Sequence, residues 1–374
     1  MSEAIRILHV LTAMNMAGTE TLLMNFYRNI DRNTIQFDFA VSATNECAYD
    51  KEIEELGGRI IHYPKYTGKN HFQYVKWWNR FLVEHPEYHI IHGHIGSTAA
   101  IYLNLAKKCG RFTIAHSHST EPALSIYSLF YKAYSYPTRF IADQFFGCSK
   151  KALIDRYGKR VANNSNAKVI NNAIDARKFV YNPNTRKRIR EEYRILPDET
   201  VLVTVGRLTP PKNPHEIIRI CHGLKEDGVD FRFLWYGTGE LENEIKQEVK
   251  AQNLEDVIQF MNTRNDIYNV LQAADVFLFP SVWEGLGIAC VEAQAAGLPT
   301  FCSNTIPDEA RVTKLSKFLP LNDTKTWCKE IEACIKKISM DDYVRPNTYN
   351  EVVQAGYDIK ETVKWLEDFY NSKW

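Results

Sequence analysis

The sequence has few of the features that mark membrane, secreted or nucleic-acid-binding proteins. Its 374 residues contain no run of about 18 consecutive apolar residues, the minimum for an ordinary membrane-spanning helix. The first residues, MSEAIRILHV, lack the charged start and long apolar stretch of a secretory signal. With 46 Lys and Arg against 45 Asp and Glu, no positive excess favours a nucleic-acid partner. We therefore expect a protein of the cytoplasm.

Cysteine motifs and several familiar catalytic motifs are also missing. The eight cysteines show no Cys-x-x-Cys spacing, so we interpret them as buried thiols in a reducing compartment. There is no P-loop, no Gly-x-Ser-x-Gly elbow and no Gly-x-Gly-x-x-Gly after the first apolar run. No Asp-x-Asp triplet is present to hold a divalent cation against a diphosphate.

Histidines alternate at two places, His92 with His94 and His116 with His118, a spacing that can suit metal ligands. No neighbouring Cys, Asp or Glu completes a ligand set, and we predict no metal site. For His116 we prefer a structural interpretation, a hydrogen-bonded histidine at a strand end.

Apolar runs alternate with helical patterns along the whole chain, which indicates parallel sheets covered by helices. The chain is also longer than a single core usually organises. The expected strands are 5–11, 37–41, 59–63, 89–92, 112–115, 144–148 and 168–170 in the first half, and 201–205, 231–236, 257–260, 276–279 and 300–303 in the second. We predict an α/β protein of two Rossmann-like domains that face each other across a cleft.

The domain boundaries follow from a polar, charge-rich interval, 181–200, which we interpret as the connection and its flanking helix. The first domain is then 1–178 and the second 179–356. The end of the chain, 357–374, reads as a helix that can pack back on the first domain.

The strongest motif begins at Glu284 and follows the expected strand 276–279 directly. Two glycines, Gly285 and Gly287, stand where a helix begins, so backbone N–H groups and the helix dipole can receive a phosphate. Glu292 lies eight residues beyond Glu284, and both carboxylates could accept hydrogen bonds from sugar hydroxyls. In isolation, a turn with two solvated carboxylates would be the preferred explanation of this pattern.

A second cluster follows the expected strand 201–205. Gly206 permits a tight turn, and Arg207 and Lys212 place two cations near the strand's carboxyl end. Such cations suit a diphosphate and the charge that develops on it as it leaves. The alternative is a solvated pair of basic residues.

Together these motifs resemble the retaining, metal-independent GT-B glycosyltransferases of glycosyltransferase family 4. The resemblance covers essentially the whole chain. It implies that Gly206, Arg207 and Lys212 clamp the donor diphosphate, that Glu284 contacts the transferred sugar, and that Glu292 contacts the ribose.

The remaining site residues also come from the resemblance. It places backbone around Gly285, Leu286 and Gly287 against the phosphates, and Gly237 and Gly239 near the nucleotide, with 265–267 a weaker match to the base-recognising segment. In the first loop, Gly18 and Glu20 match the family pattern, although Ala17 replaces a usual glycine. His118 aligns with the active-site histidine, which hydrogen-bonds the donor sugar. No cofactor is implied.

The near-zero net charge hides an uneven distribution. Residues 1–178 hold 22 Lys and Arg and 15 Asp and Glu, whereas residues 179–374 hold 24 and 30. In the first half, segments 76–81 and 127–146 mix aromatic residues with cations. Such segments suit a membrane headgroup surface or a lipid-diphosphate acceptor, although ordinary core packing of an aromatic helix is the more frequent explanation.

These observations favour a hexosyltransferase that uses a nucleotide sugar, most simply a UDP-sugar, for cell-surface polysaccharide. The acceptor is a saccharide, with a polyprenyl-diphosphate-linked saccharide expected, and the location is the cytoplasm or the inner face of the plasma membrane. Two alternatives remain: a sugar-nucleotide epimerase of the same fold, and a non-catalytic partner of another transferase.

Overall fold

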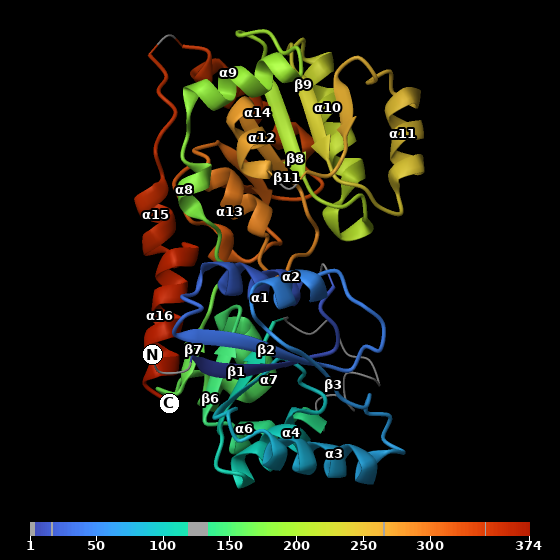
Figure 1. The fold of residues 1–374 in the computed structure, drawn as a ribbon. Coiled ribbons are helices and arrows are strands. Elements are labelled where there is room, and N and C mark those ends of the chain that lie inside the picture. The colour runs from blue at the N-terminus through green and yellow to red at the C-terminus, as the bar shows by residue number, and fades with distance from the viewer. Residues whose placement is uncertain (1–3, 16–17, 119–133, 265, 341) are drawn as a thin grey trace. The chain divides into compact units, whose positions relative to one another are not determined.

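The computed structural model describes residues 4–15, 18–118, 134–264, 266–340 and 342–374. They form two compact units, one of Met1–Ala173 with Ile359–Trp374 and one of Ile174–Asp358. Each unit contains its own parallel sheet with helices packed against it (Figure 1).

The first unit is built on seven parallel strands in the order β3-β2-β1-β4-β5-β6-β7. They are β1 (Ile5–Leu11), β2 (Ile35–Val41), β3 (Ile60–His62), β4 (Ile90–Gly93), β5 (Phe112–Ser117), β6 (Gln144–Gly147) and β7 (Ala167–Val169). Neighbours on one strand point to opposite faces, yet Ile7 and Leu8 are both fully buried because helices cover the two faces. The strand order reverses between β1 and β4, the place where such sheets bind ligands.

The helices of the first unit include one from the far end of the chain. They are α1 (Gly18–Asn29), α2 (Asp50–Glu55), α3 (His71–Glu84), α4 (Ala99–Lys108), α6 (Thr138–Ile141), α7 (Lys150–Ala162) and α16 (Ile359–Asn371). Helix α16 buries Ile359, Val363, Leu366 and Tyr370 at helical spacing and contacts α1. These four side chains belong to the core beneath β1 and β2.

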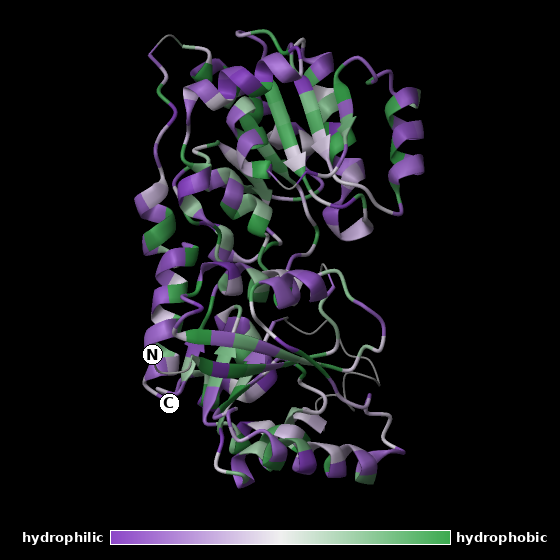
Figure 2. Ribbon diagram, in the orientation of Figure 1, coloured by the Kyte–Doolittle hydropathy of each residue, from purple (hydrophilic) through white to green (hydrophobic). Residues whose placement is uncertain are grey.

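The second unit has six parallel strands in the order β10-β9-β8-β11-β12-β13. They are β8 (Val201–Val205), β9 (Arg232–Tyr236), β10 (Ile258–Met261), β11 (Val276–Phe279), β12 (Thr300–Ser303) and β13 (Ser316–Leu319). In Figure 2 strand β8 is hydrophobic along most of its length, as expected for a central strand covered on both faces.

Eight helices and two short 3₁₀ turns accompany this sheet in the described residues. They are α8 (Ala176–Phe179), α9 (Pro183–Glu192), η1 (Pro210–Lys212), α10 (Pro214–Glu226), α11 (Glu242–Ala251), α12 (Ile267–Ala273), α13 (Ile288–Ala295), η2 (Asp308–Ala310), α14 (Thr324–Ile338) and α15 (Tyr349–Gln354).

The interval 181–200 is part of the second unit, within the predicted bounds 179–356, and it contains the predicted flanking helix as α9. It does not itself connect the two units. Helix α9 within it packs against α12, and its Ile189 is fully buried. Its Arg190 is 4% exposed and pairs with Asp275 at 3.4 Å. The chain divides after residue 173 and not 178, because Ala176 and Phe179 of α8 already lie in the second core.

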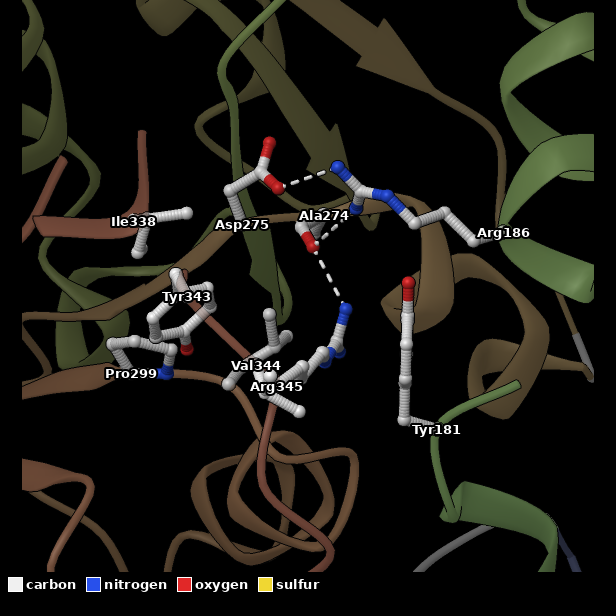
Figure 3. Close-up of a pocket in the computed structure, with 10 residues that line it drawn as sticks. Tyr181, Arg186, Ala274, Asp275, Pro299, Ile338, Tyr343, Val344 and Arg345 are labelled. Atoms are coloured by element: carbon white, nitrogen blue, oxygen red, sulfur yellow. Dashed lines mark hydrogen bonds and ion pairs between the residues drawn. The ribbon is translucent and has the colours of Figure 1, made fainter. Parts of the chain in front are cut away.

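A cavity of about 320 Å³ lies where β11 and β12 begin, at the amino edge of the second sheet (Figure 3). Figure 3 shows Arg186 and Arg345 pointing toward the carbonyl of Ala274, which accepts hydrogen bonds of 3.1 and 3.0 Å from them. Arg186 also pairs with Asp275 at 2.7 Å. Because these cations already have partners, we interpret the cluster as structural.

Arg345 ties two helices together at their carboxyl ends. Its guanidinium donates to the carbonyl oxygens of Leu271 at the end of α12 and of Ala296 directly after α13, both at 2.7 Å. These are helix-end carbonyls that have no intrahelical partner, and a buried cation suits the negative end of the dipole. Burial lowers the pKa of Arg345 to about 10, which leaves it charged at neutral pH.

Candidate active site

The loop that follows β8 carries three of the predicted residues. The Gly206 backbone N–H donates to the carbonyl of Tyr236 at 2.9 Å, which joins this loop to the end of β9. A Cβ on Gly206 would lie 3.5 Å from the Lys212 side chain. Arg207 is exposed and forms no ion pair with any described residue. The three residues line one small depression together with Pro280 and Ser281.

The glycines after β9 have a packing reason. Gly237 has φ +138°, and a Cβ there would lie 2.0 Å from the carbonyl oxygen of Gly206. A Cβ on Gly239 would lie 2.2 Å from the carbonyl oxygen of Leu208. The loops after β8 and β9 can therefore approach this closely only with glycine at both positions. Their predicted place near the nucleotide stays a prediction.

Lys212 and Glu284, 72 residues apart in sequence, meet in the structure. Lys212 Nζ lies 2.6 Å from Glu284 Oε1, and their side chains are 25% and 11% exposed. The ammonium group also lies 4.9 Å from the centre of the Phe279 ring. This is a partly desolvated cation, held at the carboxyl ends of β8 and β11.

Backbone contacts hold this pair in place. The carbonyl of Pro211 in η1 accepts a hydrogen bond of 2.8 Å from the N–H of Val282. Asn213, with φ +52°, donates from its amide to the carbonyl of Pro280 at 3.2 Å. The turn that carries Lys212 is thus fastened to the loop that carries Glu284.

The start of α13 is shaped by Gly287. Its φ of +88° is a left-handed conformation that favours glycine, and a Cβ would lie 3.0 Å from the Phe279 ring. A Cβ on Gly285 would meet nothing within 4 Å, so open space adjoins its backbone. The Leu286 side chain is 5% exposed and belongs to the second core, which leaves only its backbone to meet a ligand.

Glu292 lies in α13, one helical turn beyond Ile288. Burial raises the pKa of its carboxyl group to about 7. The carboxylate has no hydrogen-bond partner among the described residues, so an acceptor with unfilled lone pairs stands near the same helix start. Glu292 is only partly buried, and a carboxyl group with a raised pKa and unfilled lone pairs near a helix start is typical of a position that serves a ligand.

The predicted residues of the first unit lie at the carboxyl ends of β1 and β5. Gly18 begins α1 and is exposed, and burial raises the pKa of Glu20 in the first turn. Ala17 lies outside the described residues. His118 directly follows β5, and burial lowers its pKa to about 3. This imidazole is neutral at physiological pH.

Five histidines gather on one face of the first sheet, which the sequence analysis did not foresee. The five come from three adjacent strands: His9 lies on β1, His92 and His94 at the end of β4, and His116 and His118 at the end of β5. The register pairs His9 with His92, and the strand order places β1, β4 and β5 side by side. The two alternating histidine pairs are visible in the sequence, whereas nothing in the sequence links His9 to them.

This cluster bears on two predictions. His116 Nδ1 contacts His92 Nε2 at 3.2 Å, but its Nε2 is buried without a partner, so the expected hydrogen bonding of His116 is incomplete. Two groups of three, His9 with His92 and His94 and His94 with His116 and His118, have ring nitrogens within 4.8 Å of one another. The members of each group come from different strands, so spacing along the chain does not reveal either group. That no metal is bound stays a prediction.

The other predicted segments lie as follows. Asn265 is outside the described residues, and the neighbouring Asp266 is held by Arg264 at 2.7 Å, which lowers the pKa of its carboxyl group. In segment 76–81, Trp78 is fully buried and Phe81 is 5% exposed, so both are core residues. Of segment 127–146, residues 127–133 lie outside the described part of the chain.

The chain is similar in sequence to known glycosyltransferases. Residues 185–350 match the model of the family Glycosyl transferases group 1. A protein of Bacillus subtilis (strain 168) named "Putative glycosyltransferase EpsF" is 29% identical over 98% of this chain and 96% of its own. The "Capsular polysaccharide biosynthesis glycosyltransferase CapH" of Staphylococcus aureus is 24% identical over 99% of both chains.

Two further similarities concern a shorter region and the fold. The "UDP-Gal:alpha-D-GlcNAc-diphosphoundecaprenol alpha-1,3-galactosyltransferase" of Escherichia coli is 33% identical over 54% of this chain and 53% of its own. The crystal structure of Anabaena Alr3699/HepE in complex with UDP has a TM-score of 0.79 at 16% identity, covering 98% of this chain and 100% of that one. The predicted pair of Rossmann-like sheets is confirmed as the GT-B fold. In the described residues no helix is both long and apolar enough to span a bilayer.

Proposed function

We propose that this glycosyltransferase moves a hexosyl unit from a UDP-sugar to a saccharide acceptor, with retention at the anomeric carbon, in the synthesis of a cell-surface polysaccharide. The carrying observation is the Lys212–Glu284 pair, 2.6 Å apart at the start of a helix whose N-terminus has open backbone. A cation, a carboxylate and free N–H groups are what a nucleotide-sugar diphosphate and its sugar need.

Names of similar proteins support the donor and the acceptor. The E. coli relative is named for a UDP-Gal donor and a diphosphoundecaprenol-linked acceptor, and HepE is described in complex with UDP. CapH is named for capsular polysaccharide biosynthesis. We extend these to a UDP-sugar, a polyprenyl-diphosphate-linked saccharide and a polysaccharide of the capsular or exopolysaccharide type.

The roles follow from the resemblance to family 4 and from the geometry. In the free protein Lys212 forms an ion pair with Glu284. When the donor binds, its diphosphate replaces Glu284 as the partner of Lys212 and also binds Arg207. Glu284 is then free to accept hydrogen bonds from the sugar, and Glu292 from the ribose. His118 hydrogen-bonds the donor sugar. The backbone of Gly18, Gly206 and Gly285–Gly287 meets phosphate oxygens.

The reaction needs no cofactor in this proposal. The bond between the anomeric carbon and the diphosphate oxygen breaks, and its electron pair stays on the diphosphate. The acceptor oxygen bonds to the same face of the carbon, and its proton passes to the departing phosphate oxygen. Arg207, Lys212 and the helix start stabilise the charge that grows on the diphosphate, the task a metal ion performs elsewhere.

Substitution of the clamp tests this assignment. Lys212→Ala and Glu284→Ala are expected to reduce transfer from a UDP-sugar by about 100-fold or more, the range for losing one donor to a developing charge. Lys246→Ala is the matched control, because Lys246 pairs with Glu242 at the same 2.6 Å distance on α11. Full activity of both clamp variants would overturn the site.

An assay without acceptor separates the transferase from the epimerase. The proposal predicts that the donor sugar is unchanged without acceptor and is transferred when acceptor is added. An epimerase would change the configuration of the donor sugar without acceptor. A non-catalytic partner would leave the donor unchanged both with and without acceptor. Thermal-shift measurements against UDP, GDP and ADP identify the base, because a ligand that binds only the native state stabilises it.

Association with the inner face of the plasma membrane is part of the proposal. Segment 76–81 does not support this association, because its Trp78 is a core residue. Exposed apolar residues near that segment support it instead. Phe72 on α3 is 88% exposed and Phe140 on α6 is 73% exposed, and α4 packs against both helices. The full chain should bind anionic vesicles, and Phe72→Ser with Phe140→Ser should weaken that binding; equal binding by the double variant would contradict it.

A further inference from the structure

The histidine cluster contains a chain of three rings that ends at His118. His9 Nδ1 lies 3.0 Å from His94 Nε2, and His94 Nδ1 lies 2.7 Å from His118 Nε2. His9 is fully buried and packs against Phe37 and Phe39 of β2, whose ring centres lie 4.2 and 5.6 Å away. The chain therefore runs from the apolar core to the edge of the sheet.

Every ring in this chain is neutral. Burial lowers the pKa of His9 and of His118 to about 3, and that of His94 well below its usual range. A neutral imidazole has one N–H donor and one bare acceptor nitrogen. Two successive hydrogen bonds between three such rings allow only two arrangements, in which all protons point toward His118 or all point away from it.

The unpartnered nitrogen of His9 distinguishes the two arrangements. His9 Nε2 is buried and has no hydrogen-bond partner among the described residues. If the protons pointed away from His118, this nitrogen would carry an orphaned N–H in an apolar core. If they point toward His118, it carries only a bare lone pair. Orphaned buried donors are the rarer case in folded proteins, so the second arrangement is favoured.

We propose that His9 and His94 are positioning residues that fix the tautomer of His118. His9 Nδ1–H donates to His94 Nε2, and His94 Nδ1–H donates to His118 Nε2. The proton of His118 is thereby confined to Nδ1, the nitrogen that makes no hydrogen bond with the described residues. This step rests on the proposed function: His118 Nδ1–H donates a hydrogen bond to the donor sugar, and its partner is therefore a sugar hydroxyl oxygen that accepts.

The same contacts argue against a metal ion at this place. The shorter N···N distance of 2.7 Å is a hydrogen bond, whereas two ligands about 2.0–2.1 Å from a tetrahedral zinc ion lie farther apart. A divalent ion would also leave its charge in a region where no carboxylate of the described residues joins the two groups of three histidines. Bound metal is nevertheless a distinct outcome of the test.

Long-range ¹H–¹⁵N correlation spectra of the full chain, labelled at histidine and without ligand, read each tautomer directly. His118 is assigned by the loss of its signals in His118→Asn. The proposal predicts a single neutral form of His118 with the proton on Nδ1. A proton on Nε2, a mixture of both forms, or one equivalent of zinc in the purified protein would overturn it.

Variants of the middle ring separate positioning from mere packing. In His94→Asn the amide can still donate to His118, and the Nδ1–H form should persist; in His94→Leu the two forms should mix. Loss of the selected hydrogen bond should reduce kcat/KM by about 3- to 10-fold in His94→Leu, with partial rescue in His94→Asn. His71→Asn, an exposed position on α3, is the control. If both variants kept the wild-type form, the proposal would fail.

A second variant covers failure of His94→Leu to fold. His9→Phe fills the core position but removes the first donor of the chain, and it should also give mixed forms of His118. These readings need no substrate. If the predicted tautomer is observed but transfer activity is absent, the proposed function is refuted and the positioning role stands. If transfer activity is present but the tautomer differs, the positioning role is refuted and the proposed function stands.

Discussion

Replacing Glu292 by Gln should make the second unit more stable and its ligand binding weaker. Burial raises the folded-state pKa of this carboxyl group from 4.5 to about 7. Below pH 4.5 the group is protonated in both states and has no effect. Between pH 4.5 and about 7 the folded state binds the extra proton, so stability falls as pH rises, and the full cost is present above about pH 7.

The magnitude follows from the shift. About 2.5 pKa units correspond to about 3 kcal/mol between the protonated and ionised forms. Gln cannot ionise, so Glu292→Gln does not pay this cost at high pH. The difference in unfolding free energy between Glu292→Gln and the wild type should therefore be about 3 kcal/mol larger near pH 8 than near pH 4.5. For a unit of this size that gain is about 6–12 °C in Tm. Glu255→Gln, at an exposed position after α11, serves as the matched control.

Two measurements on the same proteins complete this test. Thermal unfolding near pH 4.5 and near pH 8 gives the stability difference, and calorimetric titration with UDP near pH 8 gives the affinity. A carboxylate that accepts from ribose hydroxyls is worth about 1.5–3 kcal/mol, so Glu292→Gln should bind UDP about 10- to 150-fold more weakly. A stability gain that is the same at both pH values would refute the burial argument, and unchanged UDP affinity would refute the ribose contact.

Three other perturbations have definite expected outcomes. Gly287→Ala should lose about 1–2 kcal/mol because its φ is +88°, whereas Gly285→Ala, with open space, should keep its stability yet bind UDP more weakly; urea unfolding and titration separate the two. Arg345→Met should lose about 2–4 kcal/mol in urea unfolding, because it leaves helix-end carbonyls buried without donors, and a loss under 1 kcal/mol would contradict the structural role. Transfer activity should survive EDTA, and abolition reversed by a divalent cation would contradict the metal-free proposal.

Central strands of both sheets were predictable, because a strand that is buried on both faces has a continuous run of apolar residues. The expected strands 5–11, 201–205, 276–279 and 300–303 coincide with β1, β8, β11 and β12. Strand β13, Ser316–Leu319, was not predicted, because its Ser and Lys interrupt such a run. Helix α14 beyond it was missed together with that strand.

Contacts between distant residues account for the rest. The interval 181–200 looks like a solvated linker, yet Arg186 and Arg190 are held by Asp275, which stands some 85 residues away. His9 could not be singled out, because only the pairing of β1 with β4 brings it to His92. By contrast, Lys212 and Glu284 could be placed together, since both follow strands whose carboxyl ends share one edge of a sheet.

The central claim is transfer with retention from a UDP-sugar to a lipid-linked saccharide. The most direct measurement incubates the purified chain with a UDP-α-hexose, a polyprenyl-diphosphate-linked GlcNAc and EDTA, and then determines the anomeric configuration of the product by NMR. The account predicts one UDP released for each α-linked product formed, with Lys212→Ala almost inactive. A β-linked product, or release of UDP with free hexose alone, would contradict it.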